Sequence, residues 1–347
     1  MRTLVTGAAG YLGSALTRAL EREAAEGSDN VELLLTDRSD PGRISTAAGP
    51  SQSTTAAGPS QSTTAPGPSR SAMSADRPEF VAGDIGDPQL LDQLFAEPVD
   101  TVFHLAGIVS GAAEADYELG KKVNLDATID LLERCRQQAA RGGPVARVVY
   151  ASSIAVFGTP LPPRIDDATA PAPTLSYGTH KRACELLIDD CSRRGFIDGR
   201  ALRLSGVVVR PPLANGALSG FNSDLIREPL AGRRYVCPVR PDATIWITSL
   251  PHAIGNLLHL ARVDAASIGP QRAMTTPSLA LSVADIVDAL NRVDPDAAQR
   301  IAFEPQPAIE AQFGRWPLAC AFDKGRALGL ATDASIDAVI RGHLENR

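Results

Sequence analysis

The run SYGTHK, residues 176–181, sets a tyrosine and a lysine four positions apart, as Tyr177 and Lys181. This spacing places both side chains on one face of a helix, and Cys184 and Ile188 continue that face at the helical period. Such a face points inward, and a buried ammonium group beside a phenol favours the phenolate, which lowers the tyrosine pKa from its usual value of about 10. The pair therefore predicts a general base that works near neutral pH.

Two adjacent serines precede this pair, in the run YASSIAVFG. Residues 146–153 are typical of a buried strand, so Ser152 and Ser153 stand at its C-terminal end. In a parallel sheet this is the edge where ligands bind, and a hydroxyl group there can hydrogen-bond a substrate oxygen. The serines and the tyrosine–lysine pair together predict proton transfer at a substrate hydroxyl group.

A glycine-rich turn, TGAAGYLG, places Gly7, Gly10 and Gly13 between a predicted strand and an amphipathic helix. Glycine permits the tight turn and the close approach of backbone to a pyrophosphate. The helix then offers free N–H groups and the positive end of its dipole. A glycine triplet alone is weak evidence, but in this context it predicts a dinucleotide site.

Asp37 ends the second predicted strand, at the distance expected for a carboxylate that hydrogen-bonds an adenosine ribose. A carboxylate there would repel a 2′-phosphate, which favours NAD, whereas the adjacent Arg38 leaves NADP open as the alternative. The predicted cofactor contacts along the sheet edge are Gly7, Ala9, Gly10, Tyr11, Leu12, Gly13, Asp37, Arg38, Asp84, Ile85, Leu105, Ala106 and Gly107, and the family resemblance given below adds Tyr177 and Lys181. His104 is predicted to pack in the interior and not to be catalytic.

The elements that must position these residues alternate between strand and helix through the first half of the chain. The runs VELLLTD and ARVVYASS are continuously apolar, which is typical of parallel strands covered on both faces. Strand and helix in alternation indicate βαβ units. The fold class is therefore α/β, a doubly wound parallel sheet of the Rossmann type with a smaller C-terminal substrate lobe.

We expect residues 1–204 and about 241–278 to form the dinucleotide-binding domain, and about 205–240 and 279–347 to form the substrate lobe. The run GRALRLSGVVVRPP is predicted to be a single sixth strand, and Ser282 is predicted to cap a helix. Residues 40–76 contain the near-repeat GPSQSTTAA–GPSQSTTAP. This composition cannot bury enough apolar surface to order itself, so a disordered insertion is expected.

The composition excludes several classes of protein. The 347 residues are 44% hydrophobic and 21% charged with a net charge of −6, which is typical of a soluble protein. No Lys/Arg-rich run would bind nucleic acid, and no apolar run would span a membrane. The five cysteines lack metal-site spacing, so reduced thiols and no metal are expected. The first residues read as a strand and not as a secretory leader, so a cytoplasmic protein is expected.

This set of motifs resembles the extended short-chain dehydrogenase/reductase family, the NAD-dependent epimerase/dehydratase group, over most of the chain. The resemblance implies that Ser153 is the catalytic serine, that Tyr177 is the base, and that Lys181 is its partner and holds the nicotinamide ribose. Asn124, in VNLDAT, matches an asparagine of the family's fourth helix and could anchor a water in a proton relay. Members often pair through four helices, which implies a homodimer.

Within the family, the resemblance is strongest to members that use NAD to oxidise the C2 hydroxyl of a four-carbon sugar acid to the 2-oxo acid. The runs that carry it are IVSGAAEADYELG, SSIAVFG, SRRGFIDGRALRL, VVVRP and IREPLAG. A dehydratase of the family would have Asp-Glu after the catalytic hydroxyl residue, where this chain has Ile154 and Ala155. An epimerase would present an arginine to a diphosphate, where this chain has ATIWITSL. A nucleotide-sugar 4-epimerase and a non-catalytic dinucleotide-binding sensor or scaffold stay open as alternatives.

A carboxylate substrate needs a cation or several donors. Arg210 is the first candidate, because it ends a strand at the ligand edge and is followed by Pro211 and Pro212. Trp246 could close part of the pocket. The predicted substrate contacts are Ser110, Ser153, Tyr177, Arg210, Asn215, Ser219 and Trp246.

Overall fold

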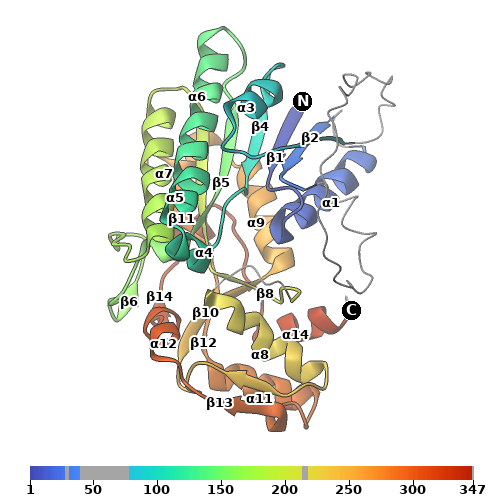
Figure 1. Cartoon of the computed structure of the whole chain (residues 1–347), viewed down its shortest axis with the longest axis vertical. Coiled ribbons are helices and arrows are strands. Elements are labelled where there is room, and N and C mark those ends of the chain that lie inside the picture. Colours follow the sequence, from blue (N-terminus) through green and yellow to red (C-terminus); the bar gives the residue numbers. More distant parts are fainter. Residues whose placement is uncertain (28–30, 40–77, 213–217, 346–347) are drawn as a thin grey trace, which may run out of the picture.

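A seven-stranded parallel sheet lies at the centre of the larger part of the molecule (Figure 1). The computed structural model describes residues 1–27, 31–39, 78–212 and 218–345. The strand order is β11-β7-β5-β4-β1-β2-β3, and every neighbouring pair is parallel. Its strands are β1 (Arg2–Thr6), β2 (Glu32–Asp37), β3 (Glu79–Ala82), β4 (Thr101–His104), β5 (Arg147–Ser153), β7 (Asp198–Leu204) and β11 (Ala273–Thr275).

Successive residues of each strand face opposite sides of this sheet, and both sides are covered by helices. Leu4 and Val102 pack among the helices of one face, whereas Val5 and Phe103 pack among those of the other. The first face carries α3 (Pro88–Leu94), α6 (Ala127–Ala140) and α7 (Ser176–Arg193), and the second carries α1 (Tyr11–Ala25) and α9 (Leu250–Arg262). The prediction of a doubly wound α/β fold is confirmed.

The predicted sixth strand is wrong in one respect, because the run divides into two strands at Ser205. Leu204 of β7 still pairs with Ser153 in the main sheet. Gly206 begins β8 (Gly206–Val208), which pairs with β10 (Thr244–Ser249) in a different sheet. Both strands are largely buried, so the local pattern satisfies either environment and could not reveal the change of partner.

The smaller C-terminal lobe surrounds its own apolar core and lies at the far end of the molecule from α6 (Figure 1). Its three-stranded sheet has the order β12-β10-β8, with β12 (Leu279–Ser282) antiparallel to β10. Whether residues 241–278 act with the dinucleotide-binding domain stays a prediction: β10 belongs to the lobe sheet, whereas α9 packs on the main sheet and β11 lies within it. The other elements of the lobe are α8 (Phe221–Leu230), β9 (Tyr235–Cys237), α11 (Val283–Val293), β13 (Ile301–Phe303), α12 (Pro307–Phe313) and α14 (Ile336–Glu345).

Helix α11 begins as the sequence predicts. The Ser282 hydroxyl accepts a hydrogen bond from the Asp285 N–H at 3.1 Å, and the Asp285 carboxylate accepts one from the Ser282 N–H at 2.7 Å. This capping box satisfies two N–H groups of the chain and confirms Ser282 as the N-cap.

Several short elements connect these layers. Those nearest the strand ends are α4 (Ser110–Ala115), α5 (Tyr117–Lys121), the π-helical turn η1 (Lys122–Asp126) and the 3₁₀ turn η2 (Ile154–Val156). The remaining ones are β6 (Arg164–Ile165), η3 (Leu218–Gly220), α10 (Ala265–Ile268), η4 (Ala298–Arg300), β14 (Ala319–Cys320) and α13 (Asp323–Ala327). The low-complexity stretch of residues 40–76 lies outside the described residues.

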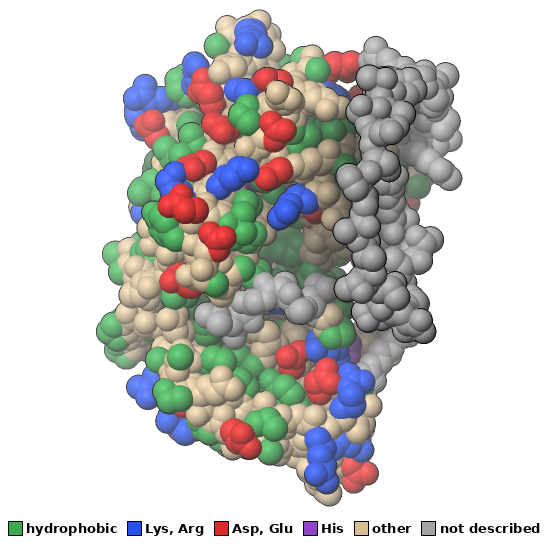
Figure 2. Space-filling view, viewed as in Figure 1, with side chains coloured by type: hydrophobic (Ala, Val, Ile, Leu, Met, Phe, Trp, Pro, Cys, Tyr) green, Lys and Arg blue, Asp and Glu red, His purple; other side chains and the backbone are tan. Residues whose placement is uncertain are grey.

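The visible surface carries basic and acidic side chains interspersed, without a large area of one sign (Figure 2). Among the helices that the structure describes, none has the length and apolar character needed to cross a membrane. The five cysteines are free thiols, and the described residues contain no cluster of His, Cys, Asp and Glu that could hold a metal ion.

Candidate active site

The glycine turn joins β1 to α1 with very little space around its backbone. Gly7 has a φ of +72°, and a Cβ there would lie 2.7 Å from the backbone nitrogen of Ala106. A Cβ on Gly13 would lie only 2.0 Å from the Gly7 carbonyl oxygen. Helix α1 begins at Tyr11 after Gly10, and no side chain caps its first N–H groups. These groups and the bare turn fit a pyrophosphate, as the sequence predicts.

Asp37 lies at the end of β2 beside this turn. Its carboxylate accepts hydrogen bonds from the backbone N–H of Ala9 at 3.0 Å and of Arg38 at 2.7 Å. These two bonds fix the carboxylate at the edge of the sheet, next to the turn that would hold the phosphates. The Arg38 side chain is exposed. The position fits a ribose contact, which stays a prediction.

Asp84 and Ile85 follow β3 along the same edge. The Gly86 N–H donates to Asp84 at 3.0 Å, and Lys122 donates to it at 3.1 Å. These two hydrogen bonds hold the pKa of Asp84 below its usual value, so the carboxylate stays charged. Ile85 is buried in the core beneath.

His104 is part of the interior, as the sequence predicts. Its two ring nitrogens lie 2.7 Å from the Thr6 hydroxyl and 3.0 Å from the Thr128 hydroxyl. Complete burial, with the charge of Lys181 as a second cause, lowers its pKa to about 3. The ring is therefore neutral near neutral pH.

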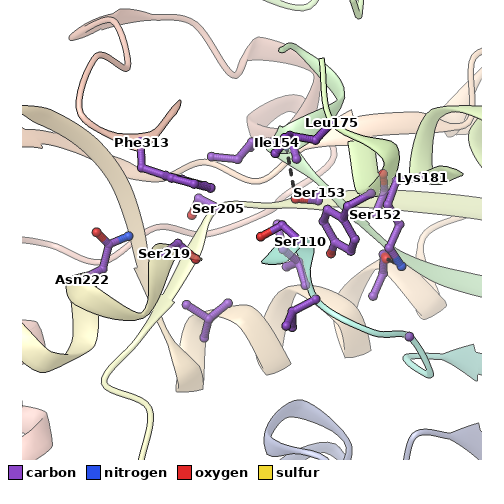
Figure 3. A pocket seen from close by; sticks show the side chains of 18 of the residues that line it. Ser110, Ser152, Ser153, Ile154, Leu175, Lys181, Ser205, Ser219, Asn222 and Phe313 are labelled. Atoms are coloured by element: carbon purple, nitrogen blue, oxygen red, sulfur yellow. Dashed lines mark hydrogen bonds between the residues drawn. The ribbon is translucent and has the colours of Figure 1, made fainter. Parts of the chain in front are cut away.

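Tyr177 and Lys181 of α7 line the same cavity as Ser153 of β5, and Figure 3 shows Lys181 and Ser153 on the same side of the view. Lys181 is 4% exposed, and its ammonium group donates to the Ala151 carbonyl at 2.8 Å. The same nitrogen lies 4.5 Å from the ring centroid of Tyr150 and 5.7 Å from that of Tyr177. The helix face predicted from the sequence therefore points inward, toward the end of β5.

The direction of the Tyr177 pKa differs from the sequence prediction. Burial raises this pKa, while a side-chain hydrogen bond with Ser153 and the charge of Arg210 lower it. Lys181 is directed at the Ala151 carbonyl, and it is not among the groups that shift the tyrosine. Burial also lowers the pKa of Lys181 itself to about 8. Arg210, a residue of the lobe, is thus the cation that favours the phenolate in this structure.

A buried ion pair supports the serines from behind. Glu185, one turn beyond Lys181 on α7, accepts two hydrogen bonds from Arg203, both at 2.8 Å. The same carboxylate accepts the Ser152 hydroxyl at 2.7 Å. Ser152 is therefore committed to this pair, which leaves Ser153 as the serine that can act on a substrate.

Asn124 lies in the π-helical turn η1, behind the segment that follows β4. Its side chain accepts from the Ile108 N–H at 2.8 Å and donates to the Ile108 carbonyl at 3.0 Å. The backbone carbonyl of Asn124 accepts a hydrogen bond from the Thr128 hydroxyl at 3.2 Å. Asn124 thus holds the segment beside the cavity, whereas the predicted water relay stays a prediction.

One cavity of about 460 Å³ connects the glycine turn, the end of β5 and the lobe. Figure 3 shows Ser153 and Lys181 toward one end of the view, Ser219 and Phe313 toward the other, and Ser110 between them. The predicted residues on its wall are Gly7, Gly10, Tyr11, Leu12, Gly13, Leu105, Gly107, Ser110, Ser153, Tyr177, Lys181, Arg210, Ser219 and Trp246. Asn215 lies outside the described residues. Ala9, Asp37, Arg38, Asp84, Ile85, Ala106 and Asn124 are not part of this wall.

Arg210 reaches this cavity from the end of β8. Its Nε donates to the Val207 carbonyl at 2.9 Å, and one terminal nitrogen lies 3.5 Å from the Ser219 hydroxyl. Among the described residues Arg210 forms no salt bridge, because Asp224, the carboxylate whose charge acts on it, pairs with Arg227. A half-buried guanidinium group in this state can accept a carboxylate from a ligand.

Tyr11 joins the cofactor side to the lobe. Its hydroxyl group donates to the Val209 carbonyl at 3.0 Å, one residue before Arg210.

Trp246 is only 1% exposed and donates to the Pro317 carbonyl at 2.8 Å. The tryptophan therefore forms a rigid part of the wall and has no free donor for a ligand.

Sequence reasoning missed a second group of wall residues. They come from the loop before α7, the β7–β8 junction, α8, and α12 with the loop that follows it. The main members are Thr174, Leu175, Ser205, Asn222, Gln312, Phe313 and Trp316. None belongs to a local motif, and only tertiary contacts bring them to the site.

Comparisons with known proteins agree with this geometry. The sequence model described as the NAD dependent epimerase/dehydratase family matches residues 3–239. The D-erythronate dehydrogenase of Cupriavidus necator is 38% identical over 352 residues, which cover 100% of this chain and 98% of that protein. The D-erythronate dehydrogenase of Haemophilus influenzae is 37% identical and covers 74% of this chain and 81% of that protein.

Solved structures are similar over the whole chain. A crystal structure described as the nucleoside-diphosphate-sugar epimerase from Agrobacterium tumefaciens has a TM-score of 0.85 and 34% identity, covering 100% of this chain and 94% of that one. The L-threonine dehydrogenase of Clostridium difficile, at 22% identity and a TM-score of 0.79, covers 99% of this chain and 96% of that one and shares the fold. On the match of residues 3–239 and the full-length similarity, the chain belongs to the NAD dependent epimerase/dehydratase family.

Proposed function

We propose that the protein is a dehydrogenase that uses NAD to oxidise the C2 hydroxyl group of a small sugar acid, D-erythronate, to 2-oxo-tetronate. The observation that carries this proposal is the position of Arg210. Its guanidinium group, without a carboxylate partner in the described chain, shares one cavity with Ser153 and Tyr177. The full-length similarity to two D-erythronate dehydrogenases supports the same substrate.

The family implies NAD, and the glycine turn fits it. Gly10 and the first N–H groups of α1 would hold the pyrophosphate, because no side chain of the protein occupies that end of the helix. Asp37 would accept hydrogen bonds from the adenosine ribose, and Lys181 would hold the nicotinamide ribose. A carboxylate fixed at Asp37 favours NAD over NADP, because a 2′-phosphate would be repelled. When bound, NAD supplies the hydride acceptor.

Side chains of the protein would remove the proton of the C2 hydroxyl group. Ser153 would hydrogen-bond the C2 hydroxyl group, and Tyr177 as phenolate would remove its proton. Burial opposes the phenolate, so the positive charge of Arg210 and the hydrogen bond from Ser153 are what make it accessible. Most of the rate enhancement would come from positioning and from these fixed charges.

Arg210 would have two tasks in this arrangement. It would bind the C1 carboxylate, next to the C2 carbon that reacts, and its charge would act on Tyr177. A 2-hydroxy acid is the class of alcohol in which the carboxylate and the reacting hydroxyl group stand on adjacent carbons. A single cation beside the base therefore selects this class of substrate.

A second candidate, a nucleotide-sugar epimerase, is supported by the similarity to the structure described as an epimerase. The two functions differ in a measurable way. An epimerase retains its cofactor and accumulates no NADH, whereas a dehydrogenase releases NADH in each cycle.

The test is a kinetic screen of the purified full-length protein with NAD or NADP and a panel of four-carbon sugar acids and nucleotide sugars. We expect NADH to accumulate with NAD and D-erythronate, and the product to react as a 2-oxo acid. Epimerised nucleotide sugar without NADH would establish the second candidate instead. No turnover of any compound would leave a dinucleotide-binding protein without catalysis.

We also infer a homodimer, formed through the outer faces of α6 and α7. Ile129 on α6 is 41% exposed and Leu186 on α7 is 52% exposed, although both are large apolar side chains. Two such helices from each copy would form a four-helix contact that removes these side chains from water. Light scattering should give a dimer mass for the wild type and a monomer mass for L186E, and a monomeric wild type would refute the inference.

A further inference from the structure

Asn222 is a polar side chain of the cavity wall whose amide oxygen has no hydrogen-bond partner among the described residues. It is the second residue of α8 and is 4% exposed. Its Oδ1 atom is buried and accepts no hydrogen bond in the part of the chain that the structure describes. Figure 3 shows the side chain at the lobe end of the cavity, on the same side of the view as Ser219 and Phe313.

A buried amide oxygen without a hydrogen-bond partner is unusual in a folded protein. Burying a polar group without a partner costs roughly 1–3 kcal/mol, and most buried amides in proteins are paired. Asn256 is the contrasting case in this chain, because its amide both donates to and accepts from the Ala331 backbone at 2.8 Å. The Asn222 amide therefore has hydrogen-bonding capacity that the described residues do not use, and a ligand in the cavity can take it up when the amide group rotates.

The surrounding backbone holds the Asn222 amide in place. A Cβ on Gly206 would lie 2.7 Å from the Asn222 Nδ2 atom, so glycine at residue 206 leaves room for the amide in the position it has here. The next residue on α8, Ser223, accepts a hydrogen bond from the Arg210 N–H at 3.0 Å. The first turn of α8 thus carries the amide and holds the backbone of Arg210.

The rest of this part of the wall is largely apolar and includes Val207, Ile245, Phe313 and Trp316. A carboxamide offers donors and an acceptor, and so does a hydroxyl group. In an apolar wall this hydrogen bond discriminates between ligands, because a ligand without the hydroxyl group would leave the amide unpaired.

We propose that Asn222 recognises a hydroxyl group on C3 or C4 of the substrate and so selects polyhydroxy acids over 2-hydroxy acids with plain alkyl chains. This inference rests on the proposed function, in which Arg210 takes the carboxylate and Ser153 with Tyr177 takes the C2 hydroxyl group. Asn222 then determines specificity and does not participate in proton transfer.

The test compares two acids that differ only beyond C2: D-erythronate, and the 2-hydroxybutyrate enantiomer of the same C2 configuration. The variant N222L replaces the amide with an apolar group of similar volume, and N222A serves as a second variant if the first does not fold. We expect kcat/KM for D-erythronate to fall about 100-fold, because a hydrogen bond in the cavity is lost, and kcat/KM for 2-hydroxybutyrate to change less than about threefold. N291L, at an exposed position of α11, is the control.

The outcomes separate the two levels of inference. If the wild type oxidises D-erythronate and the variants lower kcat/KM for both acids equally, Asn222 is structural and the present inference is overturned. An unchanged ratio with unchanged rates overturns it as well. If the wild type oxidises neither acid while binding NAD, the proposed function fails, and the selection assigned to Asn222 fails with it.

Discussion

The two halves of the cavity are built in different ways. On the sheet side, the wall consists of strand ends and bare backbone, such as Gly7, Gly10 and Gly107, and the shape depends on missing side chains. On the lobe side, it consists of side chains such as Arg210, Asn222 and Phe313, delivered by three separate elements. The comparison indicates that cofactor geometry is a property of the fold, whereas substrate choice can change by substitution in the lobe.

The largest expected effect is on the sheet side, at Tyr177. In Y177F the ring is kept but the base is lost, and removal of a general base lowers rates about 10²- to 10⁴-fold. We expect kcat with D-erythronate to fall about 1,000-fold while the Kd for NAD changes less than about threefold. The control is Y117F, because Tyr117 is an exposed tyrosine on α5. Wild-type turnover in Y177F would remove Tyr177 from the mechanism.

On the lobe side, R210M should separate substrate binding from cofactor binding. Hydrogen bonds to charged groups contribute about 1.5–3 kcal/mol, so the KM for D-erythronate should rise about 100-fold. The Kd for NAD, measured by fluorescence titration, should stay within about twofold. R141M, at an exposed position in the turn after α6, is the matched control. A rise in the NAD Kd equal to the rise in KM would mean that Arg210 supports cofactor binding as much as substrate binding, and that the two halves of the cavity do not act separately.

The opposite separation should follow from a substitution in the glycine turn. A Cβ on Gly10 would meet only the Gly7 carbonyl oxygen, at 3.2 Å, so G10A should fold. The added methyl group stands where the backbone must approach the pyrophosphate, so the NAD Kd should rise about tenfold. The KM for D-erythronate at saturating NAD should not change. The control is G255A, because a Cβ on Gly255 would meet nothing within 4 Å.

The sheet side could be read from the sequence because its signals are local. Glycine spacing, a strand that ends in Ser152 and Ser153, and a Tyr–Lys pair at helical spacing each lie within one short segment. Parallel strands then bring these segments to one edge without further information. The fold class and the glycine turn were therefore predictable.

The lobe side was not readable for the opposite reason. Asn222 and Phe313 are far apart in the sequence, and nothing near either of them indicates a cavity. The change of sheet between Leu204 and Gly206 also leaves no signal in the sequence, because the strands on either side are both largely buried. Even the electrostatics of Tyr177 depended on this side, since Arg210 acts on it across the cavity. Long-range packing decides such features, and local patterns do not record it.

The smallest expected effect compares the two buried cations. The pKa of Lys181, on the sheet side, is lowered by burial to about 8, whereas the Arg210 guanidinium on the lobe side keeps its proton at any working pH. Between about pH 8 and 10.5 the unfolded chain therefore holds a proton on Lys181 that the folded chain has lost. Raising the pH through this window favours the folded state, by up to about 1.4 kcal/mol per unit and about 3 kcal/mol in all.

The K181M variant should lack this contribution. The free energy of unfolding should be measured with urea at pH 7.5 and pH 9.5. Its change between the two pH values should be more positive in the wild type than in K181M. Buried thiols and tyrosines with raised pKa values act in the opposite direction, but they are present in both proteins and cancel in the difference. Equal pH slopes would mean that Lys181 keeps its ordinary pKa in the folded protein, and that the sheet side, like the lobe side, has a cation that does not titrate near neutral pH.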